Sequence, residues 1–439
     1  MRRKCFAKGC VCIFYSQTTS SALLHCLSEA ARIKNTYTDG RKFYACEKIK
    51  YTLLRQYYSI HPPLTPPAIL WYTETTDLYK RMNFMKKAII AMSGGVDSSV
   101  AALLTLGMGY ECIGATMKLF DNDDIGESRE KTCCSLSDVE DARSVAASLG
   151  MKYYVFNFSE CFGECVIDRF VDDYEHGRTP NPCIDCNKYL KFDKMFLRAR
   201  ELGYDYVVTG HYARIEKAED RYLLKKAADP TKDQSYVLYS MTQNQLAHTL
   251  FPLGGMDKSC VRKIAEEHGF INAKKHDSQD ICFVKSGTYA DFIRHYTGRD
   301  YPHGDFVNSD GDVLGEHKGI ICYTVGQHRG LGLSTQEPLY VKKVDAVSNK
   351  VVLCKNEELF SKSLDADHIN LISTDRIDGP MRVCAKVRYR QTEQPATVVQ
   401  TGDDTIHIEF DEPQRAVTPG QAVVIYDGDT VVGGGTIKE

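Results

Sequence analysis

The stretch that decides the fold is Ala88-Ile-Ile-Ala-Met-Ser-Gly-Gly-Val-Asp-Ser-Ser99. It joins an apolar strand to a helix through a glycine-rich loop. The run Ala88–Met92 predicts the strand, and Ser98–Leu106 predicts a helix that ends near Gly107. In the loop Ser93–Ser99, adjacent glycines let backbone amides approach a phosphate, and the helix N-terminus adds unpaired N–H groups. No Gly-Lys-Ser/Thr follows, so this is not a Walker loop. An ordinary glycine-rich turn is the alternative, and the complete string after a strand favours the phosphate loop.

Strands and helices alternate beyond this loop. Further strands are predicted at Cys112–Met117, Tyr153–Phe158 and Tyr206–Thr209. A capping box at Ser137–Glu140 predicts the start of a helix that stops at Gly150, and 184–202 predicts a basic helix. This order predicts an α/β fold with a doubly wound parallel sheet.

The pattern changes near residue 294, where glycine-rich turns and short strands begin. Asp310-Gly-Asp312 and Gly402-Asp-Asp404 are typical of hairpin turns. Short alternating runs predict strands of a small antiparallel barrel or sandwich at Ala396–Gln400, Thr405–Phe410 and Gln421–Tyr426. The domain boundaries expected from these changes are 85–293, 294–362 and 363–439.

Residues 1–84 differ from the rest. They carry 13 Lys and Arg against 5 Asp and Glu, five cysteines and the only tryptophan, Trp71, without sustained periodicity. The first 28 residues are basic and lack acids, as in an organelle transit peptide. A start codon assigned too far upstream is the alternative we favour, since Met85 opens directly into a strand. We expect this segment to be an extension, disordered or absent from the natural protein.

Composition bounds the class of protein. The chain has 439 residues, 43% of them apolar, and no run of about 18 apolar residues, so no membrane span is expected. Its 17 cysteines are odd in number and irregularly spaced, which favours free thiols in a reducing cytoplasm. The net charge is −3, so a nucleic-acid surface must be a local basic patch.

A cysteine pair follows two prolines in Arg178-Thr-Pro-Asn-Pro-Cys-Ile-Asp-Cys-Asn-Lys188. Cys183 and Cys186 stand at the start of the basic helix, where the helix N-terminus, Lys188 and Lys191 are expected to lower a thiol pKa. Half of a zinc site is the alternative, but zinc normally takes four ligands and no second Cys-x-x-Cys is present. A distant cysteine, Cys282, lies in a polar segment.

Other cysteines carry less weight. Cys133 and Cys134 are adjacent and cannot easily chelate one metal together, and their role stays open. Cys112 and Cys384 lie in predicted strands and are expected in the core.

The motifs together resemble one family. Ser93–Ser99 resembles the phosphate loop of the ATP-pyrophosphatase superfamily. The full set is similar, in order, to the bacterial tRNA-specific 2-thiouridylases (tRNA-uridine 2-sulfurtransferases, MnmA type), over about residues 86–438: Ser93–Ser99, Thr179–Asn187, Thr209-Gly-His-Tyr212, Lys232-Asp-Gln234, Cys282 and Arg388-Tyr-Arg390. The resemblance implies an adenine nucleotide alpha hydrolase-like catalytic domain, a small central domain and a C-terminal β-barrel-like domain.

The resemblance also implies roles for individual residues. The residues implied for ATP are Ala91, Met92, Ser93, Gly94, Gly95, Val96, Asp97, Ser98, Met117 and Gly210. Those implied at the target base are Asn181, Pro182 and Cys183, and those implied to contact tRNA are Lys232, Asp233, Gln234, Arg388 and Tyr389. Cys186 is the implied nucleophile and Cys282 the implied persulfide carrier, with Mg²⁺ held by Asp97 through pyrophosphate.

The implied reaction is ATP-dependent 2-thiolation of the wobble uridine of the lysine, glutamate and glutamine tRNAs. The 2-oxygen is adenylated, persulfide sulfur replaces it, and a Cys186–Cys282 disulfide remains. A cysteine desulfurase or a sulfur-relay protein would supply the sulfur. Many family members carry aspartate where this chain has Cys183, and three thiolates at Cys183, Cys186 and Cys282 could instead bind a [4Fe-4S] cluster. The sequence leaves both chemistries open.

Two other functions compete. Another ATP-pyrophosphatase-loop enzyme, such as a lysidine-type or amidating synthetase, would not need the cysteine trio. A non-catalytic tRNA-binding paralogue would not need the intact loop with Cys186 and Cys282. We further expect those two cysteines to be juxtaposed, with Cys183, in one cavity facing the phosphate loop. Lys188, Lys191, Lys194 and Arg198 are expected to share a helix face that binds tRNA, unless that face is merely solvated, with Arg388 and Arg390 as a second contact.

Overall fold

The computed structural model describes residues 86–120, 136–275, 281–284 and 287–438, and the backbone of 4–7 and 10–13. The chain forms two units, Met1–Phe84 and Met85–Glu439. In the first, β1 (Lys4–Ala7) and β2 (Cys10–Ile13) pair antiparallel. The remaining expectations for 1–84, and those for Cys133 and Cys134, lie outside the described residues. Nowhere in the described part of the chain is a helix long and apolar enough to cross a membrane.

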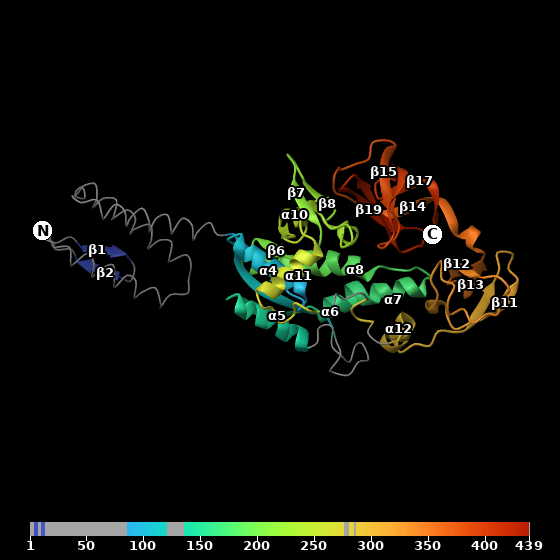
Figure 1. Cartoon of the computed structure of the whole chain (residues 1–439), viewed down its shortest axis with the longest axis horizontal. Helices are drawn as coiled ribbons and strands as arrows, with labels where there is room; N and C mark the ends of the chain where they lie inside the picture. The colour runs from blue at the N-terminus through green and yellow to red at the C-terminus, as the bar shows by residue number, and fades with distance from the viewer. Residues whose placement is uncertain are drawn as a thin grey trace. The chain divides into compact units, whose positions relative to one another are not determined.

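A parallel sheet forms the core of the second unit (Figure 1), in the order β5-β4-β3-β6-β9. Every neighbouring pair is parallel. The strands are β3 (Lys87–Ala91), β4 (Glu111–Lys118), β5 (Lys152–Asn157), β6 (Tyr206–Val208) and β9 (Thr249–Leu250). The chain runs outward through β4 and β5 and returns to β6 beside β3, which makes the carboxyl end of β3 a topological switch point.

Helices cover both faces of this sheet, which confirms the doubly wound prediction. One face packs on α4 (Val96–Gly107), α5 (Leu136–Ser148) and α11 (Lys258–Glu267). The opposite face, which includes Ile89, packs on α9 (Met195–Glu201). Helix α5 begins one residue before the predicted capping box, so Ser137 lies inside its first turn.

The predicted helix over 184–202 is continuous but contains a π-helical stretch. It consists of α8 (Pro182–Asp185), the π-helical η4 (Cys186–Lys194) and α9. A second interrupted helix, which the sequence reasoning missed, comprises α6 (Ser159–Phe162), η3 (Gly163–Ile167) and α7 (Asp168–Glu175). Other missed helices are α11, η5 (Ser235–Leu238), α10 (Gln243–Ala247) and α12 (Tyr289–Thr297).

A four-stranded sheet follows in the order β11-β10-β13-β12. Its strands are β10 (Gly304–Val307), β11 (Val313–His317), β12 (Tyr340–Asp345) and β13 (Lys350–Cys354), with short 3-10 turns η6 (Ile320–Cys322) and η7 (Asn356–Leu359). Asp310-Gly-Asp312 joins β10 to β11 as a hairpin, as predicted. Helix α12 runs across residue 294, where the sequence pattern changes.

The C-terminal strands form a closed antiparallel barrel, because β14 pairs with both β17 and β19. The barrel strands are β14 (Phe360–Leu371), β15 (Met381–Lys386), β16 (Gln394–Gly402), β17 (Thr405–Arg415), β18 (Ala422–Asp427) and β19 (Thr430–Ile437). An unpredicted hairpin from the catalytic domain, β7 (Arg214–Lys217) and β8 (Tyr222–Lys225), extends this sheet where Thr430 pairs with Lys225.

One hydrophobic cluster joins the catalytic domain to the barrel. It contains Phe192 of η4, Tyr236 of η5 and Tyr426 of β18, each almost fully buried. The Tyr236 hydroxyl also donates to the carbonyl of Ala422 at 2.8 Å. This contact places the edge of the barrel over the carboxyl end of the parallel sheet.

Candidate active site

The phosphate loop leaves β3 at Ala91 and enters α4 at Val96. Gly94 has φ +75°, and a Cβ there would overlap the backbone of Asp138 on α5, so only glycine fits this close approach. The Ser98 hydroxyl donates to the Gly95 carbonyl at 3.0 Å and accepts from the Ser93 amide at 3.3 Å. The loop is therefore held in one shape by its own side chains and by α5.

Two residues beyond α11 hold the same loop from the other side. Asn272 Nδ2 donates to the Gly94 carbonyl at 3.0 Å and to Ser99 Oγ at 2.9 Å. Lys275 Nζ contacts the Gly94 carbonyl, Asp138 Oδ1 and Asp141 Oδ2. Sequence reasoning missed both residues, because neither belongs to a spaced motif.

Asp97, in the first turn of α4, is engaged by two partners. Lys258 Nζ lies 2.8 and 2.7 Å from its two carboxylate oxygens, and the Tyr212 hydroxyl donates to Oδ1 at 2.7 Å. Among the residues the structure describes, no three His, Cys, Asp or Glu side chains gather as a metal site. A carboxylate beside a phosphate loop suits Mg²⁺ that arrives with a nucleotide, because Mg²⁺ is usually held by one or two carboxylates and substrate phosphates.

The segment after β6 brings Gly210 and His211 to the loop. A Cβ on Gly210 would overlap the backbone of Asp97 and Ser98, so this glycine permits close packing against α4. His211 is buried, and its Nδ1 lies 2.7 Å from Thr209 Oγ1. Burial, and then the charge of Lys191, hold the pKa of His211 well below its usual value, which keeps the ring neutral.

The cysteine pair starts at the N-terminus of α8. Asn181 caps this helix, since its Oδ1 accepts from the Cys183 amide at 3.2 Å. Cys183 is exposed to the cavity and Cys186 is buried, and both carry free thiols. Burial raises the pKa of both thiols, and Lys191 lowers it only in part. The prediction of lowered pKa values was therefore wrong, because desolvation outweighs the nearby charge.

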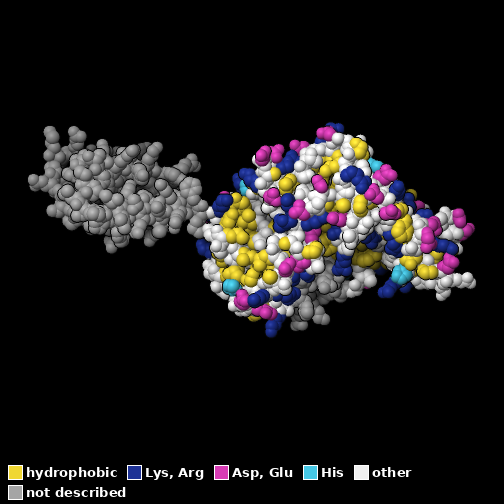
Figure 2. All heavy atoms as spheres, turned by 45° about the horizontal axis from the view of Figure 1, so that its top comes forward, with side chains coloured by type: hydrophobic (Ala, Val, Ile, Leu, Met, Phe, Trp, Pro, Cys, Tyr) yellow, Lys and Arg dark blue, Asp and Glu magenta, His cyan; other side chains and the backbone are white. Residues whose placement is uncertain are grey.

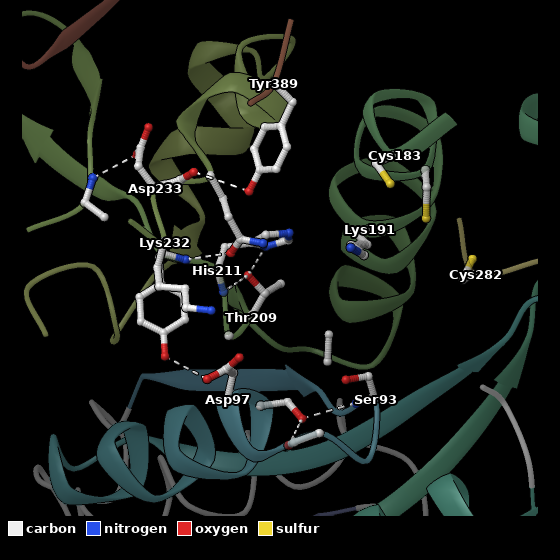
Figure 3. Close-up of a pocket in the computed structure, with 18 of the residues that line it drawn as sticks. Ser93, Asp97, Cys183, Lys191, Thr209, His211, Lys232, Asp233, Cys282 and Tyr389 are labelled. Atoms are coloured by element: carbon white, nitrogen blue, oxygen red, sulfur yellow. Dashed lines mark hydrogen bonds between the residues drawn. The ribbon is translucent and has the colours of Figure 1, made fainter. Parts of the chain in front are cut away.

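All three candidate cysteines, Cys183, Cys186 and Cys282, line one cavity of about 1400 Å³ together with the phosphate loop. Figure 3 shows Cys183 and Lys191 on one helix, Cys282 on a separate segment, and Ser93 and Asp97 below them. The predicted placement around one cavity is confirmed. The cysteines do not form a three-ligand metal group in the described residues, so the iron–sulfur alternative has no geometric support there.

The cavity is more basic than the chain as a whole. The described cations on its wall outnumber the acids seven to four. The cations are Lys191, Lys226, Lys232, Lys258, Lys275, Lys386 and Arg390, and the acids are Asp97, Asp138, Asp233 and Glu393. On the surface in Figure 2, basic and acidic side chains are interspersed. The excess of cations on the cavity wall agrees with the expectation of a local basic patch in a chain of net charge −3.

The residues implied to contact tRNA divide into two groups. Lys232 and Tyr389 line the cavity, and Asp233 and Gln234 lie on its wall with their side chains bonded inside the protein. Arg388 is not on the wall. Its Nη2 donates to the carbonyls of Val325 and Ala416 and to Thr418 Oγ1, at 3.0, 3.1 and 2.6 Å. Arg388 therefore links parts of the C-terminal half, and its neighbour Arg390 reaches the cavity.

The predicted basic face of the helix meets the cavity at one residue. Lys191 lies on the cavity wall, whereas Lys188, Lys194 and Arg198 do not. Lys188 Nζ lies 5.2 Å from the centre of the Tyr189 ring, and Arg198 pairs with Glu201 at 2.7 Å. The predicted tRNA track along this helix stays a prediction for the exposed positions.

Comparison with known proteins accounts for all three domains. Family models match residues 86–286 (tRNA methyl transferase HUP domain), 290–355 (tRNA methyl transferase PRC-barrel domain) and 361–437 (aminomethyltransferase beta-barrel domain). The chain is 53% identical over 356 residues to the tRNA-specific 2-thiouridylase MnmA of Clostridioides difficile, which covers 81% of this chain and 98% of the relative. The chain belongs to the tRNA-specific 2-thiouridylase family. Another 2-thiouridylase, from Acetivibrio thermocellus, is 51% identical over 80% of this chain and 99% of the relative.

Solved structures align only weakly with this 2-thiouridylase family member. A 4-thiouridine synthetase–RNA complex with bound ATP covers 48% of the chain at 18% identity, with a TM-score of 0.31. An NMN synthetase from Francisella tularensis covers 50% at 15% identity, with a TM-score of 0.29.

Proposed function

We propose that this protein uses ATP and persulfide sulfur to convert the 2-oxygen of a tRNA uridine to sulfur. The observation that carries the proposal is a single cavity with a phosphate loop at one end and three cysteines at the other. The family supports tRNA as the substrate, since the relatives are named tRNA-specific 2-thiouridylases.

ATP occupies the loop end in this proposal. The amides of Ser93–Ser98 and the N-terminus of α4 would bind its phosphates, and Lys275 and Lys258 add positive charge nearby. Met117 and Gly210, also on the cavity wall, would flank the nucleotide. When bound, Mg²⁺ neutralises charge that develops on the pyrophosphate. The uridine flips out of its stack, and its 2-oxygen attacks the α-phosphate of ATP with release of pyrophosphate.

Sulfur transfer occupies the cysteine end. The terminal sulfur of a Cys282 persulfide attacks C2 of the adenylated uridine, and AMP leaves with the oxygen. Cys186 then attacks the Cys282 sulfur, so that a Cys186–Cys282 disulfide forms and 2-thiouridine is released. Because burial raises the pKa of Cys186, this thiol is protonated at rest and must lose its proton before it reacts. Lys191, which opposes that rise, favours the deprotonation.

The target tRNAs, the residues that contact them and the sulfur donor are proposed from the family resemblance. The target is the wobble uridine of the lysine, glutamate and glutamine tRNAs, bound near Asn181, Pro182 and Cys183, with Lys232 and Tyr389 as tRNA contacts. A cysteine desulfurase or a relay protein would supply the sulfur to Cys282. Arg388 Nη2 donates inside the protein, so its implied contact with tRNA stays a prediction.

Methyl transfer to tRNA is the second candidate, because the matching family models are described as tRNA methyl transferase domains. The cysteine-lined wall favours sulfur transfer, since methylation from a carrier does not need three thiols. The test is to incubate the protein, ATP, Mg²⁺ and a persulfide donor with total tRNA from a thiolation-deficient strain. We expect AMP release together with 2-thiouridine in the digested nucleosides. Thiolation without ATP, or ATP-dependent adenylation with no sulfur product, contradicts the proposal.

A further inference from the structure

Lys258 is the first residue of α11, and its position is fixed at both ends. Lys258 is 9% exposed, and its backbone amide donates to Asp229 Oδ2 at 3.2 Å. Its Nζ lies 2.8 and 2.7 Å from the Asp97 oxygens and 5.6 Å from the centre of the Tyr212 ring. The ammonium group therefore sits against the first turn of α4, on the wall of the cavity.

This ion pair involves Asp97, the carboxylate that the family resemblance implies for Mg²⁺. Lys258 contacts both Asp97 oxygens and the Tyr212 hydroxyl donates to Oδ1, so a divalent cation bound at this carboxylate would lie close to the ammonium group. A cation placed at Asp97 would repel the ammonium group, while a nucleotide in the phosphate loop would bring several negative oxygens within its reach. Lys258 would then meet phosphate oxygens with the same Nζ that now contacts the carboxylate.

We propose that Lys258 is an exchangeable counter-ion: it pairs with Asp97 in the nucleotide-free protein and transfers to a phosphate oxygen when Mg²⁺ and ATP bind. The inference rests on the proposed function, because it requires ATP in this loop. It assigns Lys258 two opposite effects. The residue keeps Mg²⁺ away from Asp97 until ATP is present, and it strengthens the binding of the nucleotide that carries the metal.

Lys258→Gln tests these effects separately in the full chain. Without nucleotide, Mn²⁺ binding measured by electron paramagnetic resonance should become severalfold tighter, because Asp97 has lost its competitor. With Mg²⁺ present, ATP binding measured by calorimetry should become about tenfold weaker or more, because a charged hydrogen bond to phosphate is gone. Lys258→Arg keeps the charge and should restore most of the ATP affinity.

Lys263→Gln is the matched control, since Lys263 lies on the same helix with a side chain that is 76% exposed and paired with Glu267. It should change neither affinity. If Lys258→Gln unfolds, Lys258→Met keeps the aliphatic stem and carries the same two measurements. If the Mn²⁺ and ATP affinities of Lys258→Gln change in the same direction, or do not change, the proposed exchange is wrong. The proposed function is unaffected by that result as long as the wild-type protein binds ATP. A wild-type protein that binds no ATP overturns the proposed function, and the exchange with it.

Discussion

The two ends of the cavity are built differently. At the loop end, the backbone is held from two sides. Gly94 packs against α5 without room for a side chain, and Asn272 and Lys275 both donate to its carbonyl. At the cysteine end, the exposed Cys183 and the buried Cys186 have raised thiol pKa values and line the cavity, and one cation, Lys191, opposes that rise. Phosphate binding needs fixed amides and charges, whereas sulfur chemistry needs thiols that change their protonation and bonding. The contrast implies that either end can be disabled without the other.

The sharpest separation is expected from Cys282→Ser. It should abolish thiolation, because no sulfur can be carried, while ATP-dependent adenylation of tRNA continues. Mass spectrometry of digested nucleosides measures the first, and AMP incorporation into tRNA measures the second. Cys260→Ser is the control, since Cys260 is an exposed cysteine on α11 outside the cavity. Thiolation that survives in Cys282→Ser would remove this residue from the mechanism.

Asp97→Asn should produce the opposite separation. Adenylation should fall by about 100-fold or more, because the metal carboxylate is lost from a site that stabilises developing charge. Binding of tRNA should stay within about twofold, since the wider cavity wall is unchanged. Filter binding at fixed salt measures the tRNA affinity. Asp220→Asn, in the exposed turn between β7 and β8, is the control. A parallel loss of tRNA binding would show that the two ends are not independent.

Gly94→Ala tests how rigid the loop end is. The left-handed backbone alone costs about 1–2 kcal/mol for alanine. Gly109→Ala isolates this term, since Gly109 has φ +84° and open space around it. Gly94→Ala adds the overlap with Asp138, so its loss of unfolding free energy and of ATP affinity should exceed that of the control. Denaturant unfolding and calorimetry compare the two variants. Equal losses would mean that α5 yields and the loop is not fixed.

The smallest effect is expected from Lys191→Gln at the cysteine end. Because Lys191 lowers the pKa of Cys183 and Cys186, its removal should raise both values further. The pH dependence of iodoacetamide alkylation should therefore move toward higher pH, by about one unit or less. Lys188→Gln should leave the curve in place, because Lys188 lies over the Tyr189 ring. A curve that does not move in Lys191→Gln would remove this cation from the control of the thiols.

The sequence predicted those features that depend on local pattern. The phosphate loop, the parallel strands and the Gly402-Asp-Asp404 hairpin were found because turn chemistry and apolar periodicity act over a few residues. The sharing of one cavity by Cys183, Cys186 and Cys282 followed from the rule that open sheets bind ligands at their carboxyl edge.

Features that depend on burial and distant packing were not predictable in the same way. The thiol pKa direction was wrong because the sequence shows Lys191 but not the walls that desolvate the sulfur. Lys258 and Asn272 reach the loop from more than 150 positions away, so no spacing marks them. The spacing of the basic residues also did not predict the π-helical stretch, or that Lys191 would be the one of the four to line the cavity.

Because Thr430 pairs with Lys225, one part of the cavity wall is synthesised well before the part that completes it. Hairpin β7–β8 leaves the ribosome 205 positions before its partner strand β19, which at typical translation rates is about 10–40 s. Over that interval the barrel residues Tyr389, Arg390 and Tyr426 are not yet in place on the wall. A chain that stops before β19 therefore has the phosphate loop but lacks the enclosure that the completed barrel adds to the cavity.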